Sequence, residues 1–247
     1  MLGLTLATAC VASAPSGPRT PVASSKAAAV LGNVQRFYAN ANQLRAQFHE
    51  VVKTASSSAA QTSEGTVLVS KPDDVRFDYL VRNGNRSALA VTKTVIFDGS
   101  TLWTINHGTR QIVQRQSPTG GVVPAAVSFL TGGPTLQTHF TASLNTSGSY
   151  GTRNSTVLEL VPKQQDAPYK QLFFVVDSSD WHVSESIVVE SNGDTSEFRF
   201  YAPNFKQAVN NSLFQVSPGS LPNYQRVVQT PQAGGASAGL ASAGTTP

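Results

Sequence analysis

The fold is decided by Gly65-Thr-Val-Leu-Val-Ser-Lys-Pro72, by Val75-Arg-Phe-Asp-Tyr79 just after it, and by Phe97-Asp-Gly-Ser-Thr-Leu-Trp103 further on. Large apolar side chains recur at every second position, which is the spacing of strands with one buried face. Pro72 and the Asp-Gly pair before Ser100 are turn signals between such strands. The stretch therefore predicts a curved sheet with an apolar face. No catalytic cluster lies near it, so it indicates apolar binding.

The amino-acid composition and the distribution of charge indicate which kinds of partner the protein can bind. Charged residues make up 13% of the 247 residues, about half of the ~25% typical of soluble domains. Solvation must then rest on Ser, Thr, Asn and Gln, which suits an exported protein. The net charge of +4 comes from dispersed residues rather than from a run of Lys or Arg. Nucleic-acid binding needs clustered positive charge, so we expect no nucleic-acid partner.

The N-terminus carries a compartment signal. Residues 1–14 form a short apolar run that ends in small residues, like a secretory signal without its basic start. Two readings of Cys10, the only cysteine, stay open. It is lost with the leader, or it belongs to a lipobox-like Ala7-Thr-Ala-Cys10, is acylated and becomes the mature N-terminus. In both cases the mature core has no disulfide.

A helix is expected to begin at Ser24-Ser25, after a Pro/Ser/Ala/Gly-rich linker over residues 15–24. Apolar residues then recur at helical spacing and form one stripe, while polar residues occupy the opposite side. The stripe consists of Val30, Leu31, Val34, Phe37, Tyr38 and Ala41. Such an amphipathic helix must cover an apolar surface, and the sheet face is the nearest one.

From Leu44 the period falls to two, and alternating segments with turns between them continue along the chain. We count roughly eleven strands, the last at residues 213–216. Residues 125–130 form a short apolar segment between Pro/Gly clusters, which favours a short helix with hinge-like ends. The alternative is a crossover loop plugged into the core.

The expected architecture is α+β: an incomplete, open antiparallel β-barrel with an N-terminal helix and short lid helices over its concave face. A twisted sheet of this size tends to curl, and the helix can fill the concave side. One domain would span residues 25–228. Residues 229–247 lack periodicity and read as a disordered tail.

Catalytic and metal motifs are missing from the sequence. The four histidines lie in separate strands or turns, and none has a zinc-ligand spacing. No Gly-x-Ser-x-Gly, Walker loop or dinucleotide fingerprint occurs. We therefore expect neither an enzyme nor a bound metal or cofactor.

The motifs resemble those of a known family. Lys71-Pro72, Arg76-Phe77-Asp78-Tyr79 and Asp98-Gly-Ser-Thr-Leu-Trp103, taken in order, are similar to the periplasmic outer-membrane lipoprotein carriers of LolA type. The resemblance covers about residues 26–220. It implies an unclosed barrel whose concavity is covered by helices. The cargo would be lipoprotein acyl chains, received from an inner-membrane ABC transporter and passed by a periplasmic monomer to an outer-membrane acceptor.

Parity and the resemblance together name candidate site residues. The lipid-binding cavity would be lined by Val67, Val69, Val75, Phe77 and Tyr79 of the sheet and by Val30, Leu31, Val34 and Phe37 of the helix. The lid would be formed by Ala125, Val127, Phe129 and Leu130. Lys71 matches a family position that often carries an arginine which latches the lid. Ordinary core packing is the alternative for each residue, and Trp103 is left unassigned.

Three other functions compete with the carrier. A lipid-anchored outer-membrane receptor of the same fold would need Cys10 to be acylated. A sensor of acylated ligands would need a second domain, for which the residues after Gly219 are too few. A lipid hydrolase would need a nucleophile and a base, which the motifs do not supply.

Overall fold

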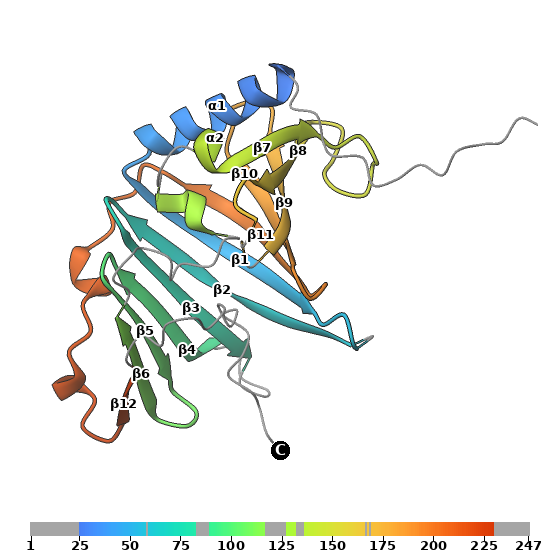
Figure 1. Cartoon of the computed structure of the whole chain (residues 1–247). Helices are drawn as coiled ribbons and strands as arrows, with labels where there is room; N and C mark the ends of the chain where they lie inside the picture. The colour runs from blue at the N-terminus through green and yellow to red at the C-terminus, as the bar shows by residue number, and fades with distance from the viewer. Residues whose placement is uncertain are drawn as a thin grey trace, which may run out of the picture.

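The computed structural model describes residues 25–57, 59–82, 89–116, 127–131, 136–165, 167 and 169–229. Figure 1 shows one strongly curved sheet, with the helices of residues 25–40, 128–131 and 136–139 on its concave side. The helical elements are α1 (Ser25–Asn40), α2 (Leu136–His139) and the 3-10 helices η1 (Ser128–Thr131), η2 (Asn211–Phe214) and η3 (Pro218–Ser220). No helix within these residues is long and apolar enough to cross a membrane.

Twelve strands form the sheet within the described ranges. They are β1 (Gln43–Lys53), β2 (Ala60–Ser70), β3 (Asp74–Arg82), β4 (Leu89–Asp98), β5 (Thr101–Asn106), β6 (Gln111–Gln116), β7 (Phe140–Leu144), β8 (Ser155–Pro162), β9 (Tyr169–Asp177), β10 (Val183–Glu190), β11 (Thr195–Asn204) and β12 (Gln225–Gln229). Their order is β12-β6-β5-β4-β3-β2-β1-β11-β10-β9-β8-β7. The sheet ends in two different edge strands, β12 and β7, so the predicted open antiparallel barrel is confirmed.

The C-terminal part of the sheet differs from the prediction. The strand expected at residues 213–216 is wrong: Asn210 accepts a hydrogen bond from Ser212 N, and the chain turns into η2 instead. Phe214 is buried by this turn. The twelfth strand is β12, which pairs in parallel with β6. It has no buried face, so it carries no alternation that a sequence reading could detect.

Alternation places the concave face as predicted from the sequence. Leu44, Ala46 and Phe48 of β1 are buried, whereas Arg45 and Gln47 between them are exposed. The buried sets of neighbouring strands face the same side, under α1 and η1, and form the main hydrophobic cluster. We call this cluster the apolar interior.

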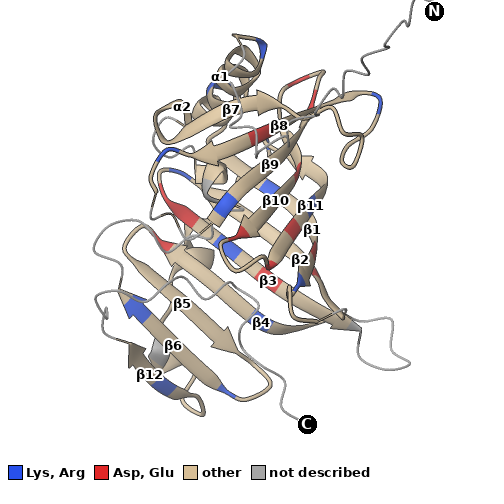
Figure 2. Cartoon of the chain, turned by 45° about the vertical axis from the view of Figure 1, so that its right-hand side comes forward, with Lys and Arg blue, Asp and Glu red and all other residues tan. Residues whose placement is uncertain are grey.

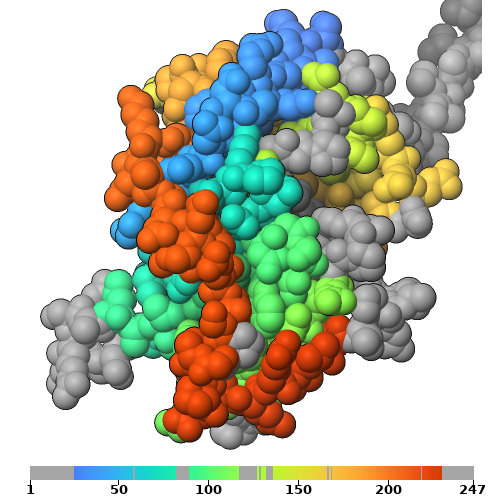
Figure 3. All heavy atoms as spheres, turned by 90° about the vertical axis from the view of Figure 1, so that its left-hand side faces the viewer, coloured from blue at the N-terminus to red at the C-terminus, as the bar shows by residue number. Residues whose placement is uncertain are grey.

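The convex face carries a second, smaller cluster built partly by the C-terminal segment. Leu68, Ile96, Trp103, Ile105 and Ile112 of the sheet pack there with Val209 and Phe214. Figure 3 shows the orange and red C-terminal segment lying across the cyan and green strands of the sheet. This segment therefore leads from β11 to the far edge along the outside of the barrel.

A buried polar chain fastens that segment to the sheet. Arg76 holds Asp78 through two hydrogen bonds and donates a third to Leu213 O (2.8 Å). Thr94 Oγ1 donates to Asp78 Oδ1 (2.7 Å) and lies 3.1 Å from His107 Nε2. Because the single Thr94 proton goes to Asp78, His107 Nε2 is the donor to Thr94, and its Nδ1 accepts from the Tyr224 hydroxyl (2.9 Å).

Charged side chains do not gather into one region. Figure 2 shows the Lys and Arg segments scattered among Asp and Glu over the strands. Several are engaged within the sheet, as Arg199 is with Glu197 (2.7 Å).

Candidate functional site: an apolar interior beneath the helices

The floor of the apolar interior is formed first by β2 and β3. Val67 lies opposite Phe77 and Val69 opposite Val75, while Tyr79 lies opposite Gly65. All five predicted floor residues are buried, at 4% exposure or less, and all belong to the main cluster. The structure thus brings together Val67, Val69, Val75, Phe77 and Tyr79.

Aromatic rings gather around Phe77 and Tyr79 on this floor. Phe48 of β1 contacts Phe77 at 5.4 Å and Tyr79 at 5.2 Å between ring centroids, both edge to face. Phe198 of β11 lies 6.0 Å from Phe77. Edge-to-face pairs at these distances are favourable beyond the area that they bury. Phe48 and Phe198 were not among the predicted site residues, although Phe48 has the parity of Leu44.

The helix α1 closes one end of the interior. Leu31 and Val34 are buried in the cluster, and Val30 and Phe37 pack against it while partly exposed. Tyr38, which was predicted on the helix stripe but not in the site, is also buried. Its hydroxyl accepts a hydrogen bond from Val183 N of β10 (3.1 Å).

The 3-10 helix η1 inserts into the concave side. Val127, Phe129 and Leu130 are each 3% exposed or less and belong to the same cluster as the sheet residues. The Phe129 ring lies 5.0 Å from that of Tyr38 and 4.8 Å from that of Phe174 on β9. Ala125, the fourth predicted lid residue, lies outside the described residues. Phe129 is therefore the ring that joins η1 to both α1 and the sheet.

Lys71 contacts α1 rather than η1 within the described part of the chain. Its Nζ donates to the carbonyl oxygen of Tyr38 and to that of Ala39 (3.0 Å). These carbonyls are in the last turn of α1, which has no basic residue of its own. A cation at this end also interacts favourably with the helix dipole. Desolvation lowers the pKa of Lys71. The side chain thus holds the helix end, whereas the resemblance implied a contact with the lid.

The contact between Lys71 and the end of α1 should slow the local opening of this helix. Replacing Lys71 with Met is expected to raise amide exchange within residues 25–40 about five- to thirtyfold, because charged hydrogen bonds to the helix end are worth about 1–2 kcal/mol. Hydrogen exchange read by mass spectrometry checks this. Lys53→Met, on the exposed end of β1, is the matched control and should leave exchange unchanged. Equal exchange in the Lys71 variant and the wild type would show that the latch holds nothing.

Trp103, left unassigned from the sequence, lies on the convex side. It is 8% exposed and belongs to the convex cluster, and its indole Nε1 donates to Asp98 Oδ2 (3.0 Å). Asp98 Oδ1 also accepts from Ser100 N and Thr101 N. The Asp-Gly-x-x-Leu-Trp motif therefore shapes the β4–β5 hairpin, and Gly99 takes φ +83° at its turn.

One polar group on the concave face was missed by sequence reasoning. Glu50 is 2% exposed, and its carboxylate is attracted to Lys93 near the Tyr79 ring. Glu50 has the parity of Phe48, and this was the available signal.

No candidate for metal or bond chemistry appears among the described residues. They hold no group of three or more His, Cys, Asp or Glu side chains able to bind a metal ion. What the geometry defines is a protein with an apolar interior enclosed between a curved sheet and helical elements that are not part of the sheet.

Comparisons with known proteins agree with this class. The family model described as "Outer membrane lipoprotein carrier protein LolA" matches residues 39–217. The chain therefore belongs to the LolA family, whose carriers are periplasmic and non-enzymatic. An outer-membrane lipoprotein carrier protein of Dechloromonas aromatica is 23% identical over 192 residues, covering 77% of this chain and 85% of that protein.

Two solved structures are similar to this chain at low sequence identity. A LolA superfamily protein from Nitrosomonas europaea has a TM-score of 0.41 at 12% identity and covers 77% of this chain and 97% of its own. An uncharacterized conserved protein from Thermus thermophilus has a TM-score of 0.48 at 11% identity, covering 83% and 99%.

Proposed function

We propose that this protein is a periplasmic carrier that takes up the acyl chains of lipoproteins in its apolar interior. It would receive them from the inner-membrane lipoprotein-releasing ABC transporter and pass them to the outer-membrane acceptor, as a monomer and without bond chemistry. Family membership supports the class of cargo. The cavity would be lined by the five β2 and β3 residues named above and by Val30, Leu31, Val34 and Phe37 of α1. The lid would consist of Ala125, Val127, Phe129 and Leu130.

The proposal rests mainly on one observation: the side chains that cover the floor come from segments outside the sheet. Phe129 and Leu130 come from the four-residue helix η1, Val127 directly precedes that helix, and Leu31 and Val34 come from α1. Neither helix belongs to the sheet. Both can therefore leave the floor while the hydrogen bonds of the strands stay intact, and the exposed floor would be apolar.

Exchange of contacts explains how such a carrier releases its cargo. An acyl chain of about sixteen carbons gains on the order of 10 kcal/mol on burial, at ~0.8 kcal/mol per CH₂. A preformed empty cavity would keep most of this gain and would release slowly. When η1 and α1 must first give up their own contacts, the net affinity falls by that amount. Cargo and helices then compete for one floor, and transfer in both directions remains possible.

Extraction of a lipoprotein from a membrane tests the proposal. The mature protein is incubated with proteoliposomes that carry a diacylated lipoprotein and the releasing transporter with ATP, and the supernatant is analysed by native mass spectrometry. The expected result is a soluble one-to-one complex. A lipoprotein that stays with the vesicles at every protein concentration would contradict the proposal.

The same spectra address the acceptor reading left open by Cys10. An intact mass that includes acyl groups on Cys10 would place the protein on the outer membrane as a receptor. A mass without them agrees with a free carrier.

A further inference from the structure

Three polar side chains stand on the otherwise apolar floor of the interior. Glu50 of β1 is 2% exposed and Tyr79 of β3 is 4% exposed. Lys93 of β4 is half-buried, and its Nζ lies 3.8 Å from the centre of the Tyr79 ring. We call these residues the polar group.

Strand register explains why they meet. Tyr79 and Lys93 are direct partners across β3 and β4. On the other side of Tyr79 the partner is Gly65, and beyond Gly65 lies Phe48, two residues before Glu50 on the same face. Gly65 has no side chain, and the Phe48 ring fills the space above it and contacts Tyr79. Glu50, next on the same face of β1, brings its carboxylate to the Tyr79 hydroxyl.

The arrangement is costly for the folded protein alone. Burial raises the pKa of Glu50 and lowers that of Lys93, and their mutual attraction only partly offsets this. Buried ion pairs seldom stabilise a fold more than apolar residues would. The Tyr79 hydroxyl faces the Glu50 carboxylate, and burial together with this carboxylate raises the pKa of Tyr79. The Ser186 hydroxyl of β10 is buried without a hydrogen-bond partner within the described residues. Perturbed groups of this kind cluster at functional sites.

The polar group lies at the end of the floor away from α1. The helix end is tied to Lys71, which follows the last residue of β2, whereas Gly65 lies further back along that strand. From Leu44 to Glu50 the inner row covers six residues, or about 20 Å at ~3.3 Å per residue. One leaflet of a bilayer core is about 15 Å thick, half of ~30 Å, and this is the depth of its acyl chains. A chain seated under α1 and η1 would end near Glu50, Tyr79 and Lys93.

We infer that Tyr79 and Lys93, held in place by Glu50, bind the ester carbonyl oxygens that join acyl chains to the head group of the cargo. The inference rests on the proposed function and specifies where along the floor the polar part of the cargo lies. A carbonyl oxygen only accepts hydrogen bonds. The Tyr79 hydroxyl and the Lys93 ammonium are donors, and Glu50 keeps the ammonium on this face.

The test compares two probes that differ only in these carbonyls. One is a cysteine peptide with a dipalmitoyl-glyceryl group, and the other is its dihexadecyl ether analogue. We expect wild-type protein to bind the ester about tenfold more tightly than the ether, the value of one or two hydrogen bonds to a desolvated donor. Phosphatidylglycerol with ester or ether chains, run in parallel, shows whether phospholipid esters are bound in the same way.

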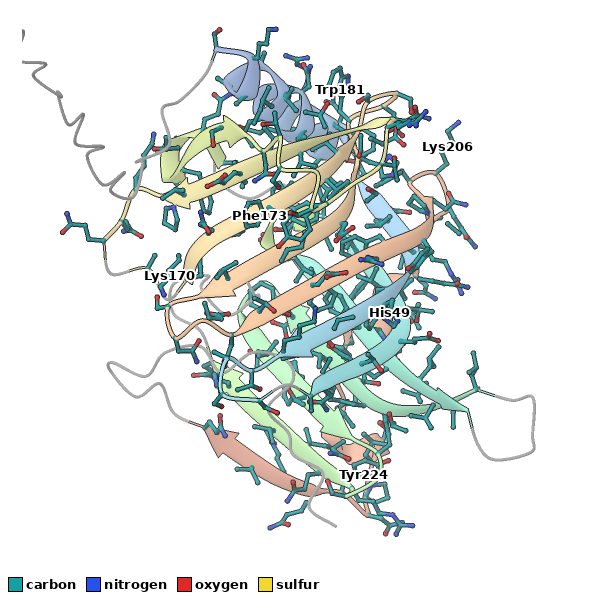
Figure 4. The ribbon with its side chains drawn as sticks, turned by 90° about the vertical axis from the view of Figure 1, so that its right-hand side faces the viewer. His49, Lys170, Phe173, Trp181, Lys206 and Tyr224 are labelled. Atoms are coloured by element: carbon teal, nitrogen blue, oxygen red, sulfur yellow. The ribbon has the colours of Figure 1, made fainter. Side chains whose placement is uncertain are left out.

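Tyr79→Phe is the sharpest variant because it removes only the hydroxyl and keeps the ring. It should reduce the preference for the ester about three- to tenfold while the protein stays folded, as its unfolding midpoint shows. Lys93→Met should remove the rest of the preference. Lys170→Met, on an exposed position of β9 labelled in Figure 4, is the matched control and should keep the tenfold ratio.

The possible outcomes are separable. Equal binding of ester and ether by the wild type overturns this inference and leaves the carrier function standing. An ester preference that survives in both Tyr79→Phe and Lys93→Met also overturns it. If the Lys93 variant does not fold, the inference is decided by the ester-to-ether ratio of the wild type and by its change in Tyr79→Phe. Binding of neither probe overturns the carrier function and this inference together.

Discussion

Phe129→Ala is expected to increase the affinity for a diacylated lipopeptide about thirtyfold. The ring contacts Tyr38 and Phe174 in the free protein, and cargo must displace it. Displacing the ring costs about 2 kcal/mol of the binding free energy, the usual value of burying a Phe side chain, and the variant avoids this cost. Titration with a fluorescent lipopeptide measures the change.

The same substitution is expected to lower the free energy of unfolding of the empty protein by about 3–5 kcal/mol, the usual cost of removing a buried Phe ring. Phe173→Ala is the matched control. Phe173 neighbours Phe174 on β9 but packs on the convex side with Val157 and Tyr150. Phe173 is labelled in Figure 4. It should cost stability without raising affinity. A Phe129 variant that binds lipopeptide more weakly than wild type would show that η1 is part of the floor and not a displaceable lid.

Gly65→Ala is expected to destabilise the protein by more than about 3 kcal/mol, from a backbone clash added to overpacking. A Cβ at residue 65 would lie 2.1 Å from Asp78 O on β3 and 2.7 Å from the Phe48 ring. The first contact is with backbone, so the β2–β3 pairing must shift. The second displaces Phe48 from its place between Phe77 and Tyr79. Denaturant unfolding followed by tryptophan fluorescence gives the loss.

Gly219→Ala provides the comparison for this substitution. No atom lies within 4 Å of a Cβ there, and its φ is not in the left-handed region. It should change the unfolding free energy by no more than about 0.5 kcal/mol. An equally small change in Gly65→Ala would mean that β2 and β3 are not packed as described.

Most of the fold and of the floor was predicted from the alternation of apolar and polar residues along the strands. Val67, Val69, Val75 and Phe77 were predicted on one face because parity is a local property, and they lie together. The helix stripe around Leu31 and Val34 was predicted for the same reason. β12 was missed because an exposed edge strand has no buried parity, and its place depends on pairing with β6.

The parts that sequence could not supply depend on distant segments. Lys71 was predicted as a latch, but its partner follows from where α1 ends in space, which no local pattern reports. Trp103 and Leu102 are neighbours on a strand that is covered on both faces, Leu102 on the concave side and Trp103 on the convex side. Alternation alone therefore could not predict which side Trp103 faces. Glu50 and Lys93 meet around Tyr79 through the register of four strands, β1 to β4, which no local pattern reports.

In the proposed mechanism, acyl chains replace η1 and α1 on the sheet floor. The most direct measurement uses unmodified protein and a diacylated lipopeptide whose chains end in a photoreactive diazirine. After irradiation, the labelled residues are identified by mass spectrometry. We expect labels on Phe174, Phe200 and their neighbours on the concave side, and none on Phe173 or Trp103. Labelling confined to the convex clusters, or no labelling at saturating probe, would contradict the claim.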